Sequence, residues 1–165
     1  MTVRVRPAHA DELGEVGELT VAAYDADGYL VPDDPYVERL RDTAARAREA
    51  ELYVATLEDL PGRLAGTVTF CPEGSPWSEI AGPGEGEFRM LGVAPEARRR
   101  GVAVSLVSTC HERSRELGYT AVVLSSLPDQ LAAQRIYTRL GFRRTPDLDW
   151  TPLPGVDLLA FRLDL

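Results

Sequence analysis

The sequence predicts an α/β protein built around a mixed sheet. Segments with strand-like patterns alternate with segments of helical spacing, in the order β-α-α-β-β-β-α-β-α-β-β. Residues 120–126, TAVVLSS, contain a continuous apolar run, as expected of a central strand covered on both faces. Residues 88–124 form a strand–helix–strand unit, the pattern of a parallel crossover. The length of 165 residues favours a single domain, residues 1–165.

The predicted strands share alternating or continuous apolar residues between turn residues: residues 3–8, 51–59, 63–71, 87–94, 120–126, 142–145 and 158–164. The predicted helices share apolar residues at helical spacing: residues 10–23, 35–50, 99–117 and 129–140. Asp34 is the expected N-cap of the second helix, with Pro35 at its first position. Gly118 and Gly141 are expected to end the third and fourth helices.

Composition excludes several classes of protein. The formal net charge of -8 argues against nucleic-acid binding, which needs a basic face. Neither a secretory leader nor an apolar run of membrane-spanning length is present, so we expect a cytoplasmic protein with no membrane partner. Two cysteines, Cys71 and Cys110, make neither a disulfide framework nor a metal site, so no metal is expected.

Three consecutive arginines, Arg98 to Arg100, stand at the start of a predicted helix in this acidic chain. A helix N-terminus carries partial positive charge, so each arginine costs up to roughly a few tenths of a kcal/mol there unless an anion binds. The neutral explanation is a solvated helix start. Gly101 and Ala103, however, are small enough for a ligand to approach the unpaired backbone N–H groups of the first turn. We interpret the segment as a diphosphate site, and the absence of lysine excludes a P-loop.

This segment resembles the signature of the GNAT superfamily of acyl-CoA-dependent N-acetyltransferases. In that signature a V-x-P-like turn after a strand is followed by R/Q-x-x-G-x-G/A at the start of a long helix. Here Val93-Ala94-Pro95 precedes RRRGVA at residues 98–103, and AAQRIYTRLGF at residues 132–142 matches a second family element. The resemblance covers nearly the whole chain. It implies a mixed, mostly antiparallel central sheet flanked by helices.

The resemblance also implies that acetyl-CoA is the co-substrate. The residues implied to contact it are Leu91, Gly92, Val93, Arg98, Arg99, Arg100, Gly101, Val102, Ala103, Val104, Gln130 and Ala133. The chain departs from the family pattern at two of them. Ala103 replaces the second glycine of the phosphate loop, and Gln130 stands where the family often has asparagine.

Two residues are candidates for moving protons. The resemblance gives Tyr137 the role of the acid that protonates the leaving thiolate, and the alternative is a core tyrosine. Glu87 matches a position where some members carry the general base, with Glu85 in reserve. An exposed strand-end glutamate or a salt bridge with Arg89 is the alternative for Glu87. Strand alternation places Glu87, Arg89 and Leu91 on one face if no bulge intervenes.

The expected reaction is acetyl transfer from acetyl-CoA to an amine by direct attack on the thioester. Three long loops, residues 23–36, 75–87 and 146–157, contain both aromatic and acidic residues, a combination that suits a cationic small-molecule or peptide amine. The loops are also expected to be acidic simply because the whole chain is. Two further functional alternatives are a non-catalytic acyl-CoA sensor or partner-binding module and an acyltransferase that uses longer thioesters or an oxygen nucleophile. A homodimer is an open alternative for the assembly of the chain.

Overall fold

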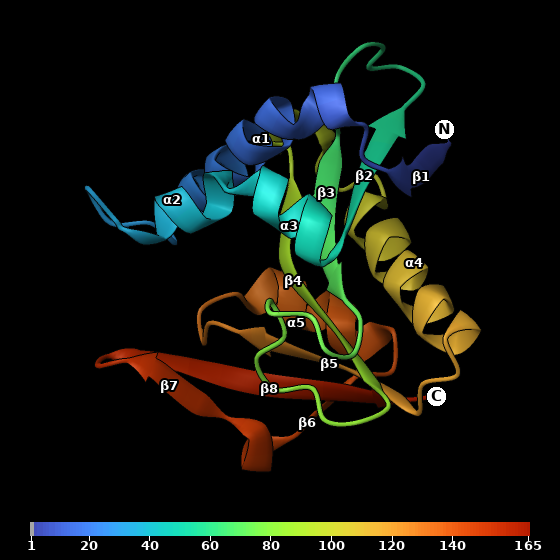
Figure 1. Ribbon diagram of the computed structural model, residues 1–165. Coiled ribbons are helices and arrows are strands. Elements are labelled where there is room, and N and C mark those ends of the chain that lie inside the picture. The colour runs from blue at the N-terminus through green and yellow to red at the C-terminus, as the bar shows by residue number, and fades with distance from the viewer. Residues whose placement is uncertain (1) are drawn as a thin grey trace. The chain divides into compact units, whose positions relative to one another are not determined.

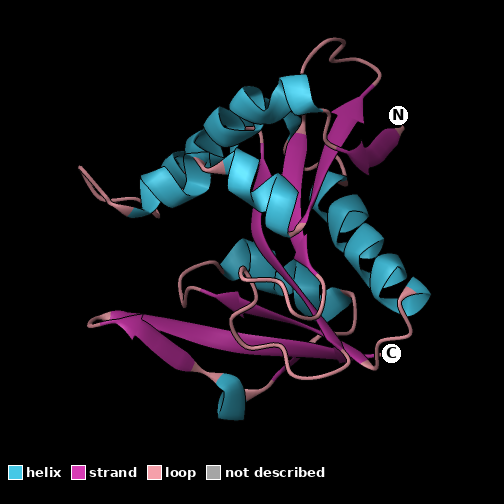
Figure 2. Cartoon of the chain, in the orientation of Figure 1, coloured by secondary structure: helices cyan, strands magenta, loops and turns pink. Residues whose placement is uncertain are grey.

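The computed structural model describes residues 2–165 (Figures 1 and 2). The chain forms two compact units, each made of two segments. The first contains the chain up to Phe70 together with Met90–Thr109, and the second contains Cys71–Arg89 and Cys110–Leu165. The prediction of a single domain stays a prediction.

The sheet of the first unit has the strand order β1-β2-β3-β4. Strand β1 (Val3–Pro7) is antiparallel to β2 (Glu51–Leu57), which is antiparallel to β3 (Gly66–Cys71). Every residue of β3 is buried. Helix α1 (Leu13–Ala26) packs Val16 against Leu52 and Val54 of β2.

The predicted second helix is two helices, α2 (Tyr36–Arg41) and α3 (Thr43–Glu49), so the prediction of one continuous helix is wrong. Asp42 interrupts it because its carboxylate accepts the Ala45 N–H at 3.3 Å and acts as the N-cap of α3. The break leaves the Leu40 carbonyl to accept a hydrogen bond from the fully buried Arg46 at 2.5 Å. Asp34 does accept an N–H at the start of α2, from Tyr36 at 3.0 Å.

The sheet of the second unit has the order β4-β5-β8-β6, with β7 paired to β8. The first residues of β4 (Glu85–Val93) pair in parallel with β5 (Ala121–Ser126), which confirms the predicted parallel arrangement. Strand β5 is antiparallel to β8 (Val156–Asp164). Helix α4 (Val102–Glu116) connects β4 to β5, and α5 (Leu131–Arg139) follows β5. The mixed sheet with mostly antiparallel pairs is as predicted.

The C-terminal segment differs from the prediction of two strands. Three strands form: β6 (Arg143–Arg144), β7 (Trp150–Leu153) and β8. Gly155, with φ of 83°, allows the tight turn by which β7 and β8 pair in a hairpin. The predicted turn therefore joins two strands of a hairpin, and residues 150–153 are strand rather than loop.

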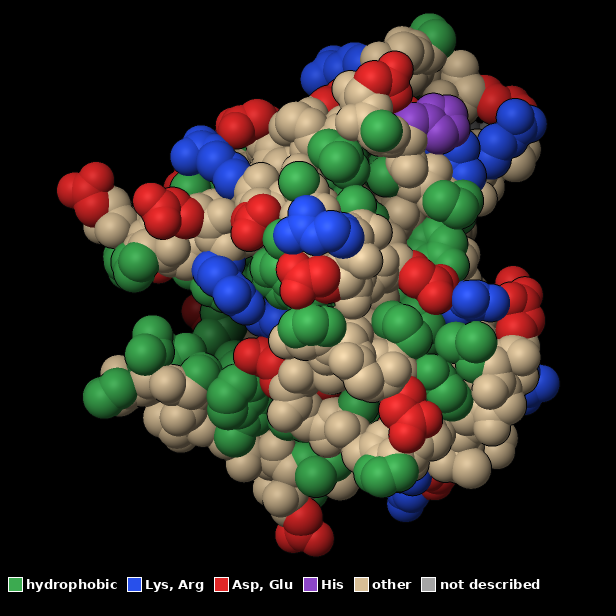
Figure 3. Space-filling view, viewed as in Figure 1, with side chains coloured by type: hydrophobic (Ala, Val, Ile, Leu, Met, Phe, Trp, Pro, Cys, Tyr) green, Lys and Arg blue, Asp and Glu red, His purple; other side chains and the backbone are tan. Residues whose placement is uncertain are grey.

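Within residues 2–165, no helix combines the length and the apolar character that crossing a membrane requires. On the face shown in Figure 3, arginine and carboxylate side chains are intermingled.

Candidate functional site

The turn that leads into α4 presents a row of backbone N–H groups, and we call residues 98–104 the α4 cradle. Arg99 and Gly101 have left-handed backbone conformations, with φ of 62° and 80°. Among the described residues, the N–H groups of residues 101–104 have no acceptor, and the first bond of the helix runs from the Ser105 N–H to the Gly101 carbonyl at 3.0 Å. A β-carbon at Gly101 would meet nothing within 4 Å, so the space in front of it is open. Such N–H concavities at helix starts bind anions.

The three arginine side chains of the cradle differ in their contacts. Arg98 is paired with Asp27 at 2.5 Å and donates to the Ala23 carbonyl at 3.2 Å. Arg100 is paired with Asp59. Arg99 is exposed and makes no ion pair within the described part of the chain. Two of the three positive charges are therefore already neutralised by carboxylates of the same unit.

Two glycines allow close packing beside the cradle. A β-carbon on Gly66 would lie 2.7 Å from Val102, so this glycine lets the start of α4 approach β3. A β-carbon on Gly92 would lie 3.1 Å from the β-carbon of Ala23, so α1 rests directly on this part of β4.

Met90 has φ of 54°, and this left-handed residue interrupts the extended backbone of β4. The even alternation expected from Glu87 through Leu91 is therefore not maintained.

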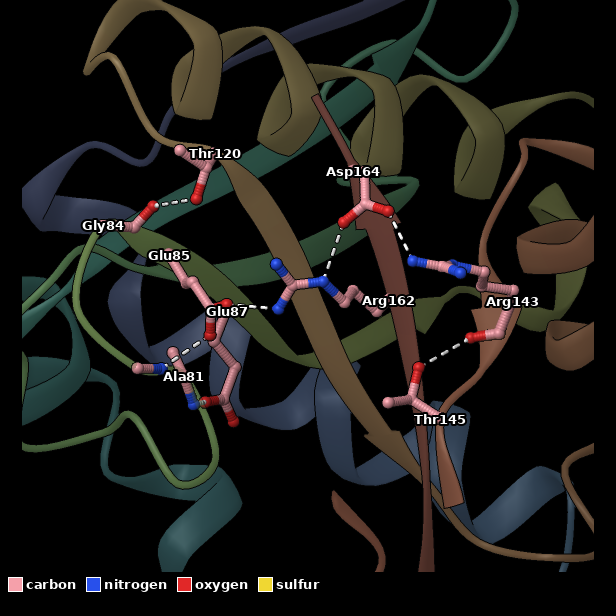
Figure 4. Close-up of polar contacts among 10 residues, drawn as sticks. Ala81, Gly84, Glu85, Glu87, Thr120, Arg143, Thr145, Arg162 and Asp164 are labelled. Atoms are coloured by element: carbon pink, nitrogen blue, oxygen red, sulfur yellow. Dashed lines mark hydrogen bonds and ion pairs between the residues drawn. The ribbon is translucent and has the colours of Figure 1, made fainter. Parts of the chain in front are cut away.

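In the second unit Glu87 is fully buried and binds the loop before β4. Its Oε1 accepts the N–H groups of Glu79, Ile80 and Ala81 at 2.9, 2.9 and 3.0 Å. Figure 4 shows Glu87 beside Ala81. Its Oε2 is also buried and has no hydrogen-bond partner among the described residues. A buried carboxylate oxygen without a hydrogen-bond partner is rare in proteins. Oε2 of Glu87 can therefore accept a hydrogen bond or a proton.

Glu87 is neither an exposed strand-end residue nor the partner of Arg89 in a salt bridge. Arg89 binds Glu79 at 3.0 Å and the Trp77 carbonyl at 3.0 Å instead. The reserve candidate Glu85 pairs with Arg162 and accepts the Gly82 N–H at 2.7 Å, as Figure 4 shows for the pair with Arg162.

Cys71 is not a nucleophile at neutral pH. Burial raises the pKa of its thiol to about 12, and the charge of Glu87 adds to this effect. A thiol rather than a thiolate is therefore present near Glu87, and only the thiolate is reactive.

Tyr137 of α5 is packed in an aromatic cluster of the second unit. Its ring lies 5.8 Å from Phe88, 6.0 Å from Phe142 and 6.1 Å from Phe161, and the residue is 6% exposed. The ring of Tyr137 therefore packs as that of a core tyrosine does, and these contacts leave the role of its hydroxyl open.

Glu87 and Tyr137 lie on opposite faces of the β4–β5–β8 sheet. Glu87 is level with Val123, and Val123 with Arg162, whose side chain binds Glu85 on the same face. Phe88 is the next residue of the extended strand, so its side chain points to the other face, where Tyr137 packs. The two predicted proton carriers therefore cannot exchange a proton directly.

The parallel pairing of β4 with β5 is short. It covers Glu85–Glu87 of β4 and Ala121–Val123 of β5, although β5 continues to Ser126. The two strands therefore stop pairing directly after Glu87.

Residues 17–142 match the model of the acetyltransferase (GNAT) family. The chain belongs to the GNAT acetyltransferase family. An uncharacterized N-acetyltransferase of Schizosaccharomyces pombe is 38% identical over 77 residues, which are 47% of each chain. A mycothiol acetyltransferase of Cellulomonas flavigena is 29% identical over 133 residues, 73% of this chain and 37% of that protein. The GNAT chain thus spans less than half the length of these two relatives.

Solved structures share the GNAT fold along the whole chain. The PaiA N-acetyltransferase of Thermoplasma acidophilum, solved in complex with coenzyme A, has a TM-score of 0.76 at 13% identity and covers 100% of both chains. YncA of Salmonella typhimurium, solved with acetyl-CoA, has a TM-score of 0.70 at 19% identity and covers 100% of this chain and 95% of that one. The family and the fold that the sequence resembles are confirmed.

Gln130, where the GNAT pattern often has asparagine, is engaged within the GNAT chain itself. Its Oε1 accepts the Leu127 N–H at 2.9 Å and the Ser126 hydroxyl at 3.1 Å. Gln134 donates to the Leu127 carbonyl at 2.9 Å, a contact that no sequence pattern predicts. Ala133 is half-buried on α5.

Across residues 2–165 no group of three or more His, Cys, Asp or Glu side chains could hold a metal ion.

Proposed function

We propose that this GNAT protein transfers an acetyl group from acetyl-CoA to an amine acceptor. The observation that carries the proposal is the open α4 cradle, with its unpaired N–H groups and the left-handed Gly101. Acetyl-CoA offers the diphosphate that such a cradle fits.

In this proposal the cradle binds the diphosphate mainly through its backbone. Of the three cradle arginines, Arg99 is the one whose guanidinium is not paired with a carboxylate of the described residues, so it is available to the diphosphate. Each charge-assisted hydrogen bond would contribute about 1.5–3 kcal/mol. The backbone of Leu91, Gly92 and Val93 would bind the acyl-pantetheine arm.

Two proton transfers accompany the reaction. A primary amine with a pKa near 10.4 is almost wholly protonated at pH 7, so it must lose a proton before its nitrogen attacks the thioester carbon. Glu87 accepts this proton at Oε2, the oxygen left without a partner. Since the side chain has no exposed surface, the proton reaches it through a bridging water molecule. As the C–S bond breaks, the Tyr137 hydroxyl donates a proton to the leaving thiolate.

The positions of the two groups support separate roles. The amine adds to the thioester carbon and forms a tetrahedral adduct in which nitrogen and sulfur are separate substituents, so one group can take the proton from nitrogen while another supplies the proton to sulfur. Glu87 and Tyr137 lie on opposite faces of one sheet, next to the point where β4 and β5 stop pairing.

A cationic acceptor is supported by a tyrosine cluster in the first unit. The Tyr24 ring lies 6.2 Å from Tyr29 and 6.3 Å from Tyr36. The exposed Asp25 and Asp33 belong to the same segment. Aromatic faces beside carboxylates attract ammonium groups.

The second candidate is a non-catalytic acyl-CoA-binding module. It is favoured by the contacts of both proposed proton carriers, because Glu87 holds a loop and Tyr137 fills an aromatic core. Both residues would then be structural.

Acetyl-CoA and a panel of primary amines test the proposal. Calorimetry first measures acetyl-CoA binding, and thiol release is then followed with each amine. Binding with amine-dependent thiol release supports the transferase. Binding without release by any amine favours the module, and no binding contradicts both candidates.

A further inference from the structure

The side chain of Arg98 leaves the cradle and binds the end of another helix. Its guanidinium donates to the carbonyl of Ala23 at 3.2 Å and pairs with Asp27, the C-cap residue of α1, at 2.5 Å. The last carbonyls of a helix lack intrahelical partners and carry partial negative charge. Arg98 therefore caps the C-terminus of α1 and is turned away from the role of phosphate ligand.

The same turn of α1 also rests on β4. The β-carbon of Ala23 approaches Gly92 so closely that a side chain there would have only 3.1 Å. Gly92 and Arg98 are both in segments proposed to hold acetyl-CoA. The last turn of α1 thus contacts two proposed donor-binding segments within the first unit.

The chain that follows this turn is the acidic loop of residues 27–35. Its Tyr29 contacts the Tyr24 ring of α1 edge-on, with the two ring planes at 85°. The loop N–H of Tyr29 also donates to the Tyr24 carbonyl at 3.1 Å. Contacts that hold the last turn of α1 in place therefore also restrict the position of the first residues of this loop.

We propose that Arg98 is a positioning residue that couples coenzyme A binding in the α4 cradle to the order of the loop 27–35. This rests on the proposed function, because it requires the cradle to bind the diphosphate. The backbone of Arg98 belongs to the cradle, while its side chain holds Ala23 and Asp27. Fixing that backbone restricts the guanidinium and thereby the end of α1. The donor then orders part of the proposed amine site before the acceptor binds.

The Arg98–Asp27 pair can be removed without unfolding the protein. Arg98 and Asp27 are both about one-third exposed, at 34% and 36%. Exposed ion pairs of this kind contribute little to folding. Loss of the pair should therefore leave the protein folded and able to bind coenzyme A through its backbone N–H groups.

The test is amide hydrogen exchange of the full chain with and without coenzyme A. In the wild-type protein, coenzyme A should slow exchange in residues 98–104 and also in residues 27–35, the latter by about fivefold or more. In Arg98→Gln and in Asp27→Asn the cradle should stay protected by coenzyme A, while the effect on residues 27–35 should be lost. Arg98→Lys, which keeps the charge, should recover part of the effect.

Arg63→Gln is the matched control. Arg63 makes a similar exposed ion pair, 2.5 Å from Glu96 in the turn before the cradle, and among the described residues it makes no ion pair or side-chain hydrogen bond with α1. This variant should keep coenzyme A protection in both segments. The proposal is overturned if coenzyme A fails to protect residues 27–35 in the wild type, or if Arg98→Gln keeps that protection. It is also overturned if Arg63→Gln loses it equally. A wild-type protein whose cradle is unprotected by coenzyme A would instead contradict the proposed function.

Discussion

Replacing Glu87 with glutamine separates its two proposed roles, proton acceptor and anchor of residues 79–81. Glutamine has nearly the same size, and its amide oxygen can still accept the three N–H groups that Oε1 binds at 2.9–3.0 Å. The loop should therefore stay in place. What the substitution removes is the negative charge and the ability of Oε2 to take a proton.

The cost in stability follows from the three hydrogen bonds. Hydrogen bonds to a charged group contribute about 1.5–3 kcal/mol each, and neutral ones about 0.5–1.5 kcal/mol. Three such changes would total about 3 kcal/mol, and relaxation of the partly exposed loop reduces this to about 1–3 kcal/mol. For a protein of this size that is a fall in Tm of roughly 2–12 °C. If Glu87 is the base, turnover should fall by about 10²–10⁴.

The assay follows thiol release with an amine that the wild-type protein acetylates, alongside thermal unfolding. Glu15→Gln is the control, since its carboxylate also accepts a loop N–H, that of Leu64 at 3.1 Å, but in the first unit. It should lose a little stability and keep its turnover. A Glu87→Gln protein with near-normal turnover would refute the role of base and leave Glu87 as the anchor of the loop.

Three further outcomes are expected. Tyr137→Phe keeps the ring packing and should lower turnover about 10²–10⁴-fold with little change in acetyl-CoA affinity by calorimetry; a small loss would make Tyr137 a core residue. Gly101→Glu should abolish acetyl-CoA binding measured by calorimetry. Gly101→Ala, which adds the same backbone strain without the carboxylate, should weaken binding less. If the two variants bind acetyl-CoA with equal affinity, the cradle is not part of the donor site. Hydrogen bonding to Arg6 lowers the pKa of Glu12 to about 2, so the pair stabilises the fold fully above about pH 4.5 and loses that contribution as pH falls toward 2. The part-exposed pair should contribute about 1 kcal/mol, and Glu12→Gln should remove that share of the acid dependence in denaturant unfolding between pH 7 and pH 3.

Most of the secondary structure could be predicted because it depends on local pattern. The apolar run of β5 and the glycines that end helices are visible in the sequence, and the structure has these elements within a few residues of the prediction. The helix break at Asp42 is not predictable from local pattern, because an aspartate inside a helical pattern acts as a cap only when the released carbonyl finds a partner. That partner, the buried Arg46, is recognisable only in the folded chain.

The site divides in the same way. The sequence alone determined the α4 cradle, because unpaired N–H groups at a helix start and a left-handed glycine are properties of a few consecutive residues. Only the tertiary structure decided where the arginine side chains go. Asp27 lies 71 residues before Arg98, and Asp59 lies 41 residues before Arg100. A long flexible side chain takes whichever partner folding brings within reach, and the spacing of residues along the chain does not encode that choice. For the same reason the burial of Glu87 beneath its loop, on the face opposite Tyr137, was decided by the assembled sheet.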